Sequence, residues 1–155
     1  ERMCQLDRIL TTERPSRGTF AKLLSVALTP DTGQFDVVRA GHPGLLMHGT
    51  GTVDWLEPVA GPALGLGATE WPVNRLQLQP GDGLMLLTDG LFEGPAGEGG
   101  ERLGEEGLLA NARSLARLPG AEFVKALISE TEARAEPFGG LTDDIAVIRV
   151  ERSVR

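Results

Sequence analysis

The order of the predicted secondary structure constrains the fold of this chain more than any other feature. Strand-like segments come first, at residues 21–28, 35–40, 45–48, 52–56 and 84–87. Two helical patterns follow, near residues 105–116 and 121–135, and a strand at residues 145–150 closes the chain. Because a parallel sheet needs strands that alternate with helices, this grouping predicts an α+β domain with mostly antiparallel sheets.

Turn-forming residues separate these segments. Residues 30–33 (Pro-Asp-Thr-Gly) join the first two strands into a predicted hairpin, since Pro presets one turn residue and Gly33 accepts a positive φ. Residues 49–51 (Gly-Thr-Gly) predict a second hairpin in the same way. Residues 61–67 are too rich in Gly and Pro for regular structure, so we expect a connector. Residues 93–101 form a Gly- and Glu-rich loop with nothing to bury, which we expect to be mobile.

The length and the first residues bear on domain organisation. With 155 residues the chain has the size of one domain, and we expect residues 1–155 to form it. Apolar side chains recur at helical spacing near the start, at Met3, Leu6, Ile9 and Leu10. This spacing predicts that residues 1–14 are the end of an amphipathic helix. Because the chain begins without Met and inside a helix, we expect it to be a piece of a longer protein. Apolar side chains of this helix would otherwise face water, so pairing with a second copy is a further hypothesis.

Charge and cysteine content narrow the partners and the compartment. A net charge of -7 and a pI near 4.8 argue against nucleic acid and anionic membranes, which select clustered Lys and Arg. Proteins, small molecules and cations are the expected partners. Cys4 is the single cysteine, so the chain can form no internal disulfide, which fits a reducing cytoplasm. Neither a membrane-spanning apolar run nor a signal peptide is evident, so we expect a cytoplasmic protein without membrane contact through this segment.

Carboxylates stand at the ends of two apolar strands. Asp89 comes directly after the apolar residues 84–87, and Asp143 and Asp144 come directly before the closing strand. If these strands are antiparallel neighbours, the end of the first lies beside the start of the second at a strand spacing of about 5 Å. The sequence therefore predicts that Asp89 and Asp143 lie close together.

Two neighbouring carboxylates repel each other, and a shared proton or a bound cation relieves that repulsion. Carboxylate oxygens and backbone carbonyls suit Mg²⁺ or Mn²⁺, and Gly90 after Asp89 lets its backbone approach an ion closely. A structural interpretation stays open beside this one. Asp-Gly is a common chain reversal, and the acidic segment at residues 142–144 can be a solvated turn.

Several motifs together resemble one protein family. The segments AGHPGLLM, LLTDGLFEG and LTDDIAVIRV occur in the order found in SpoIIE-type serine/threonine phosphatases, which belong to the metal-dependent protein phosphatase (PPM) superfamily. The resemblance includes the hairpin TFAKLLSVALTPDTGQFDVVRAGHPG, the connector PALGLG and the strand LQPGDGLMLLTDG. It extends over nearly the whole chain from Thr19 onward.

The resemblance implies a fold and a reaction. The fold would be an αββα sandwich of two mostly antiparallel sheets, with a two-metal centre of Mn²⁺ or Mg²⁺ at one edge. A metal-activated water would attack phosphoserine or phosphothreonine directly, since metals lower the pKa of water and neutralise phosphoryl charge. The implied substrate is a phosphorylated regulatory protein such as an anti-sigma-factor antagonist, and an upstream sensor domain is expected.

Site residues carry over from the family position by position. Asp89 matches the aspartate of the Thr-Asp-Gly motif and Asp143 the first aspartate of the closing Asp-Asp motif, both of them metal ligands. The backbone of Gly90 belongs to the same site, and Asp144 matches a supporting position. His42, in AGHP, matches a family residue for which we favour a role in ordering the loop between strands.

The chain also departs from the family pattern. Ala146 stands where family members usually have Thr, which removes a hydroxyl near the closing motif. The first metal motif, an Asp shortly before Gly-His-Gly, is absent, and RAGHPG does not replace it because Pro43 follows the histidine. In the family that aspartate bridges both metals. We therefore expect the remaining carboxylates to hold one cation weakly, and an isolated fragment to be inactive even if its parent is an enzyme. His48 is expected to be a surface residue at a strand end.

Two rival interpretations remain. A haloacid-dehalogenase-like phosphatase would share an Asp-Gly motif, but Leu87 stands at its nucleophile position and its alternating strands and helices are not predicted. A catalytically inactive phosphatase-like module that binds a phosphoprotein or a small ligand is the second rival. Retention of Asp89 and Asp143 argues against this module, and loss of the first motif argues for it.

Overall fold

A computed structural model of the chain describes residues 2–13 and 19–154. By their contacts, these residues form two compact units, one from residues 2–13, 19–44 and 57–78 and one from residues 45–56 and 79–154. Each unit contains one β-sheet. The prediction that residues 1–155 act as a single domain remains a prediction.

The first unit contains helix α1 (Arg2–Glu13) and the strands β1 (Leu23–Thr29), β2 (Gln34–Ala40), β5 (Ala60–Gly61) and β6 (Asn74–Gln77). Strand β1 pairs antiparallel with β2 from Leu23↔Ala40 to Thr29↔Gln34, which confirms the first predicted hairpin. Gly33 in its turn has a φ of 74°, a conformation that glycine adopts without strain. The other edge of β2 pairs with β5 in parallel and with β6 in antiparallel orientation.

Helix α1 packs within the first unit by a face that differs from the predicted one. Met3 and Leu10 are partly buried against the small core of Ala40, Leu64 and Trp71. Asp7 lies between them on the helix and is 4% exposed, whereas Leu6 and Ile9 are 40% and 50% exposed. The reason is a hydrogen bond: the Asp7 carboxylate accepts the backbone N–H of Gly65 at 2.6 Å, which satisfies a buried donor. The proposed pairing of this helix with a second copy stays a prediction, and the exposed apolar side chains that would support it are Leu6 and Ile9, not Met3 and Leu10.

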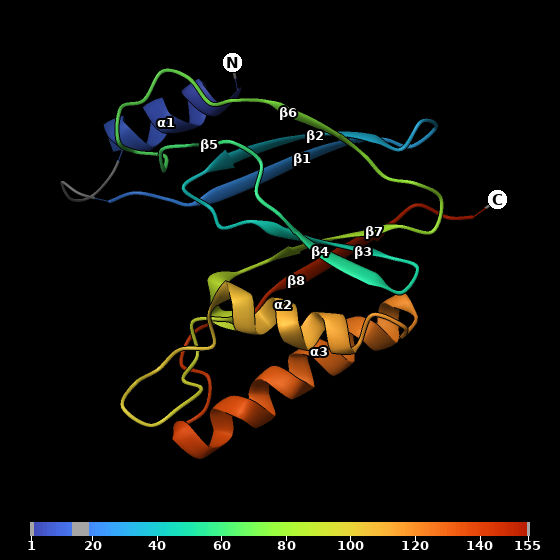
Figure 1. The fold of residues 1–155 in the computed structure, drawn as a ribbon. Coiled ribbons are helices and arrows are strands. Elements are labelled where there is room, and N and C mark those ends of the chain that lie inside the picture. The colour runs from blue at the N-terminus through green and yellow to red at the C-terminus, as the bar shows by residue number, and fades with distance from the viewer. Residues whose placement is uncertain (1, 14–18, 155) are drawn as a thin grey trace. The chain divides into compact units, whose positions relative to one another are not determined.

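The second unit contains the strands β3 (Leu45–Gly49), β4 (Thr52–Leu56), β7 (Gly83–Leu87) and β8 (Val147–Glu151), in the order β4-β3-β7-β8 with every neighbouring pair antiparallel. The helices α2 (Gly104–Ser114) and α3 (Gly120–Ala135) cover one face of this sheet (Figure 1). Two short 3₁₀ helices, η1 (Asp89–Leu91) and η2 (Glu136–Phe138), follow β7 and α3. The second predicted hairpin, both helices and the closing strand are confirmed.

The core of the second unit lies between this sheet and its helices. Buried apolar side chains form one cluster there, made of Leu46, Val53, Met85, Leu87, Leu91, Phe92, Leu108, Ala112, Ala116, Phe123 and Leu127. In β7, four of the five residues are buried, which confirms that the most apolar run of the sequence is a core strand. This strand ends two residues before Asp89.

His48 is not the surface residue that the sequence suggested. It is 4% exposed, its ring stacks on Phe123 at a centroid distance of 4.0 Å, and its Nε2 lies 2.9 Å from the carbonyl oxygen of Ala116. The reason is the sheet order. Strand β3 is an inner strand between β4 and β7, so a side chain on its helix-facing side is covered even near the strand end.

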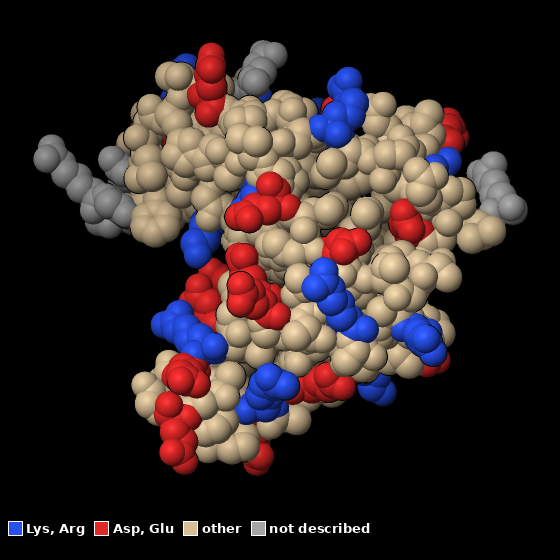
Figure 2. Space-filling view, in the orientation of Figure 1, with Lys and Arg blue, Asp and Glu red and all other residues tan. Residues whose placement is uncertain are grey.

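The architecture confirms an α+β fold with two mostly antiparallel sheets. It excludes the haloacid-dehalogenase-like interpretation, since the long strands pair antiparallel and not in a βαβ series. No helix in the described part of the chain is both long and apolar enough to cross a membrane. On the face drawn in Figure 2, acidic and basic side chains are interspersed. The expectation that the chain binds no nucleic acid stays a prediction.

Candidate metal site

The pairing of β7 with β8 brings the two acidic segments to the same end of the sheet. The strands run antiparallel from Gly83↔Glu151 to Leu87↔Val147. Asp89 therefore lies two residues beyond the last pair on one strand, and Asp143 lies four residues before it on the other. The predicted neighbourhood of these two strands is confirmed, although the closing strand begins at Val147 and not at residue 145.

Thr88 closes the gap between the two segments. Its backbone N–H donates to the carbonyl oxygen of Ala146 at 3.0 Å. Its hydroxyl donates to the carbonyl oxygen of Asp144 at 3.0 Å and accepts the backbone N–H of Ala146 at 2.9 Å. One side chain thus continues the β-ladder past the end of the strands, where Asp144 and Ala146 would otherwise lack these partners. Because these two bonds of residues 144 and 146 go to a side chain and not to backbone atoms, regular strand β8 begins at Val147 and not at residue 145.

Gly90 packs directly against the backbone of the closing motif. A Cβ atom at this position would lie 2.6 Å from the carbonyl oxygen of Asp144 and 3.3 Å from the carbonyl carbon of Asp143. Gly90 is also buried. Only glycine lets the two chain segments approach this closely. Because the φ of Gly90 is not positive, the contact with Asp143 and Asp144, and not turn geometry, requires glycine here.

A polar cavity of about 260 Å³ opens beside these residues. Its lining comprises Gly90, Glu93, Gly94, Arg102, Thr142 and Asp143. The carboxylate of Asp143 accepts the backbone N–H of Asp144 at 2.8 Å through Oδ1. Glu93 and Arg102 form an ion pair, with Nη1 of Arg102 donating to Oε2 of Glu93 at 2.8 Å. Asp89 begins η1 immediately before Gly90, and its carbonyl oxygen accepts the N–H groups of Phe92 and Glu93.

His42 belongs to the first unit, whereas the sheet that carries these residues belongs to the second. Its ring Nδ1 is 2.9 Å from the carbonyl oxygen of Pro43. Its own carbonyl oxygen accepts two hydrogen bonds from the guanidinium of Arg39, at 3.1 and 2.9 Å. Arg39 is 5% exposed and also donates to the carbonyl oxygen of Pro58. These contacts hold the loop after β2, and the loop-ordering role of His42 stays a prediction.

The sequence matches the family model described as Stage II sporulation protein E (SpoIIE) over residues 1–153. The chain belongs to the SpoIIE family. Among curated protein sequences, none matches it significantly.

Solved structures of phosphatase domains share the fold of this SpoIIE-family chain. The SiaA-PP2C domain of Pseudomonas aeruginosa has a TM-score of 0.80 and 22% identity, over 96% of this chain and 58% of that one. The RsbU and RsbW domains of Rv1364c from Mycobacterium tuberculosis have a TM-score of 0.74 and 27% identity, over 95% of this chain and 40% of that one. The phosphatase domain of SpoIIE from Bacillus subtilis has a TM-score of 0.66 and 19% identity, over 98% of this chain and 65% of that one. Another structure of the Bacillus subtilis domain was presoaked with Mn, with a TM-score of 0.66 and 16% identity.

These matches confirm the PPM-type fold that the motifs implied. The chain spans 58% of the SiaA-PP2C structure, 40% of the Rv1364c structure and 65% of the Bacillus subtilis SpoIIE domain. The activity, the substrate and the partners of the whole protein are therefore matters for proposal.

The donors at this end of the SpoIIE-family sheet are compatible with one hard cation. They are carboxylate and backbone oxygens, the ligands that Mg²⁺ and Mn²⁺ prefer. Within residues 2–13 and 19–154, no group of three or more His, Cys, Asp or Glu side chains is arranged to hold a metal. Mg²⁺ commonly binds through one or two carboxylates and keeps several waters, so a small donor set does not exclude it, and the assignment of Asp89, Asp143 and the Gly90 backbone as ligands stays a prediction.

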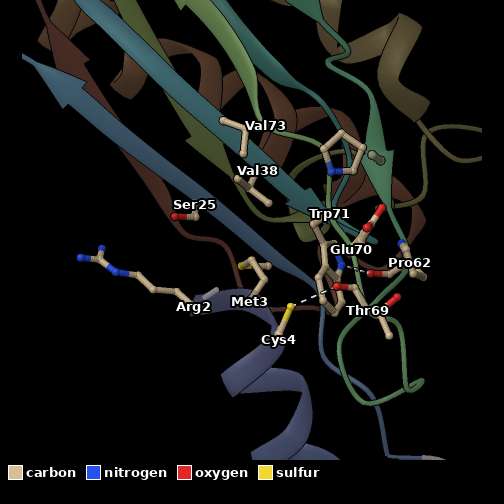
Figure 3. A pocket seen from close by; sticks show the side chains of 13 residues that line it. Arg2, Met3, Cys4, Ser25, Val38, Pro62, Thr69, Glu70, Trp71 and Val73 are labelled. Carbon is tan, nitrogen blue, oxygen red and sulfur yellow. Dashed lines mark hydrogen bonds between the residues drawn. The ribbon is translucent and has the colours of Figure 1, made fainter.

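The first unit contains a second, larger cavity of about 870 Å³ (Figure 3). Apolar side chains such as Met3, Val38 and Trp71 line much of it. The Trp71 indole donates to the carbonyl oxygen of Pro62 at 2.7 Å. The Cys4 thiol lies 3.1 Å from the carbonyl oxygen of Thr69. None of the predicted metal ligands lines this cavity. It shares no lining residue with the polar cavity at the candidate metal site.

Sequence reasoning missed three residues of the site, namely Thr88, Glu93 and Arg102. Thr88 precedes Asp89 directly, so its place at the strand end was visible, but its bonds to residues 144 and 146 depend on the strand register. The pair of Glu93 and Arg102 spans a loop that was expected to be mobile. That loop is paired across its base by an antiparallel bridge between Pro95 and Arg102, and Gly94 within it is buried, contrary to the expectation that it buries nothing. Its mobility stays a prediction.

Proposed function

We propose that this chain is part of the catalytic domain of a metal-dependent protein serine/threonine phosphatase. Its substrate is a phosphorylated regulatory protein, such as an anti-sigma-factor antagonist. The observation that carries the proposal is the contact of Gly90 with the backbone of Asp143 and Asp144, beside a polar cavity that Gly90 and Asp143 line. SpoIIE-family membership and the phosphatase domains among the structural relatives support it.

The residues of the site have distinct roles in this proposal. Asp89 and Asp143 supply carboxylate ligands, and the backbone of Gly90 supplies a further oxygen. Thr88 positions the closing motif through its hydroxyl. Asp144 supports the site through its backbone, because its N–H orients the Asp143 carboxylate. A divalent cation held here supplies an activated water and neutralises phosphoryl charge. The Mn presoak of the Bacillus subtilis relative favours Mn²⁺ as the first cation to test, and the second metal of a two-metal centre would need ligands from beyond these residues.

The experiment is a titration of Mn²⁺ into the full-length protein by isothermal calorimetry, with Asp89→Asn and Asp143→Asn beside the wild type. The matched control is Asp54→Asn, because Asp54 is an exposed carboxylate on β4 of the same unit. We expect each site variant to lose about tenfold or more in Mn²⁺ affinity and in hydrolysis of a phosphoserine peptide, whereas the control keeps both. Equal Mn²⁺ binding by the wild type and all variants would overturn the metal site.

A second candidate function is a phosphatase-like module that binds a phosphoprotein without hydrolysing it. The observation that favours it is the small donor set, since no third metal-binding side chain joins Asp89 and Asp143 in the described part of the chain. The same titration separates the two candidates. Binding of the phosphopeptide without release of phosphate, with Mn²⁺ present as well as without it, would favour the module. We further propose a cytoplasmic location and an upstream sensor domain, on the basis of the family resemblance alone.

A further inference from the structure

The cavity beside the candidate metal site contains a cation that neither the motifs nor the proposed reaction assigns. Of the six described residues that line it, Arg102 alone carries positive charge. Its side chain is 64% exposed, and its partner Glu93 is 43% exposed. An ion pair this accessible contributes only about 0 to 1 kcal/mol to stability, so a role in folding does not account for it.

The loop that carries Arg102 is well anchored to the segment before Asp143. Its base is closed by the bridge between Pro95 and Arg102, and the N–H of Ala96 donates to the carbonyl oxygen of Glu101 at 2.7 Å. The N–H of Leu103, next to Arg102, donates to the carbonyl oxygen of Gly94 at 3.1 Å. Gly94 in turn packs so closely on Leu141 that a Cβ atom would overlap the leucine side chain. The backbone of Arg102 is thereby fixed relative to residues 141–143, while its side chain reaches the cavity.

The size and the charge of the cavity indicate what it accepts. A volume of about 260 Å³ lies just below the range of roughly 300 to 1,000 Å³ found for pockets that enclose drug-sized ligands, so a small group fits better than a large one. Its charged lining residues are Glu93, Asp143 and Arg102, which sum to -1. A divalent cation on Asp143 changes this sum to +1, and the cavity then attracts an anion.

We propose that Arg102 is a substrate-binding residue that exchanges Glu93 for the phosphoryl oxygens of a phosphorylated side chain. A guanidinium binds a phosphoryl group through two parallel hydrogen bonds, and a dianion competes well against one exposed carboxylate. Glu93 holds the guanidinium at the cavity between substrates. This inference rests on the proposed phosphatase function and adds the residue that recognises the phosphoryl group.

The experiment measures binding of inorganic phosphate to the Mn²⁺-loaded full-length protein by isothermal calorimetry, so that it does not depend on turnover. The variants are Arg102→Gln, Arg102→Lys and Glu93→Gln. The matched control is Arg113→Gln, which removes the same charge from α2, where Arg113 is 59% exposed and paired with Asp54. The KM and kcat for a phosphoserine peptide, and the Mn²⁺ affinity, are measured for each protein.

We expect Arg102→Gln to weaken phosphate binding about tenfold or more, because a charge-assisted bidentate contact is lost. Arg102→Lys should recover only part of this affinity, since lysine keeps the positive charge but lacks the two parallel N–H donors of the guanidinium. Glu93→Gln should tighten phosphate binding roughly two- to fivefold by releasing the guanidinium. The loss should appear in KM more than in kcat, and Mn²⁺ affinity should match that of Arg113→Gln.

Two results would overturn the inference, and they differ in what they leave standing. If the wild type hydrolyses the peptide and Arg102→Gln binds phosphate as Arg113→Gln does, Arg102 does not recognise the phosphoryl group but the proposed phosphatase function remains. If the wild type binds neither Mn²⁺ nor phosphate and hydrolyses nothing, the proposed function and this inference both fail.

Discussion

The hydroxyl of Thr88 offers the sharpest test of how the site is assembled. Thr88→Val keeps the branched shape of the side chain but removes both the donor to Asp144 and the acceptor for Ala146. Thr88→Ser keeps the hydroxyl and is the matched control. The two variants therefore separate the hydrogen bonds from the packing of the side chain.

The structure sets the size of the effect. Two neutral hydrogen bonds contribute roughly 0.5 to 1.5 kcal/mol each, and Thr88 is only partly buried, so we expect Thr88→Val to lower the free energy of unfolding by about 1 to 2 kcal/mol. For a chain of this size that corresponds to a decrease in Tm of roughly 2 to 8 °C. Loss of a group that orients metal ligands typically lowers metal affinity about 10- to 100-fold.

The assay is calorimetric titration of Mn²⁺ into the folded variants, together with thermal unfolding without metal. Thr88→Ser should stay close to the wild type in both measurements. If Thr88→Val loses stability but binds Mn²⁺ as tightly as Thr88→Ser does, the hydroxyl supports the fold alone. In that case the Thr88 hydroxyl does not position the closing motif for metal binding.

Three further predictions follow from contacts elsewhere. Gly90→Ala should destabilise the protein by about 1 to 3 kcal/mol and weaken Mn²⁺ binding, because its Cβ would lie 2.6 Å from the carbonyl oxygen of Asp144; unchanged urea denaturation would contradict this close approach. Asp7→Ala should cost about 1 to 3 kcal/mol by leaving a buried backbone N–H without its acceptor, and Asp7→Asn, which retains an acceptor oxygen, should cost less; equal urea midpoints for the two would contradict this. The hydrogen bond from Arg75 lowers the pKa of Asp36 in the folded protein. The ionised carboxylate therefore stabilises the fold at a pH above the ordinary carboxyl pKa of about 3.9. This stabilisation is lost as the pH falls through the lowered pKa of Asp36. The stability difference between wild type and Asp36→Asn, measured from pH 7 to pH 2, should shrink in that acidic range, and a difference independent of pH would refute the assignment.

The strands of the site could be predicted from the sequence because their signals are local. The apolar residues 84–87 and the charge at Asp89 mark the end of β7, and the acidic pair marks the start of the closing strand to within a few residues, since β8 begins at Val147. Antiparallel pairing then follows from the grouping of strands in the chain. The neighbourhood of these segments therefore needed no information from elsewhere in the molecule.

Other features depend on contacts between distant residues and leave no local pattern. His48 is buried because β3 lies inside its sheet and Phe123 covers the ring, which the strand's own sequence does not reveal. Asp7 occupies the buried side of α1 because a glycine N–H far along the chain needs an acceptor. The Glu93–Arg102 pair likewise becomes meaningful only once the loop is folded beside Asp143.

The central claim is that Asp89 and Asp143 bind the same divalent ion. Calorimetric titration of Mn²⁺ into the wild type, Asp89→Asn, Asp143→Asn and the double variant tests it most directly, because two ligands of one ion are energetically coupled. The claim predicts a large loss of affinity in each single variant and little further loss in the double variant. Losses that simply add, or a single variant that binds Mn²⁺ as the wild type does, would show that the two carboxylates do not share an ion.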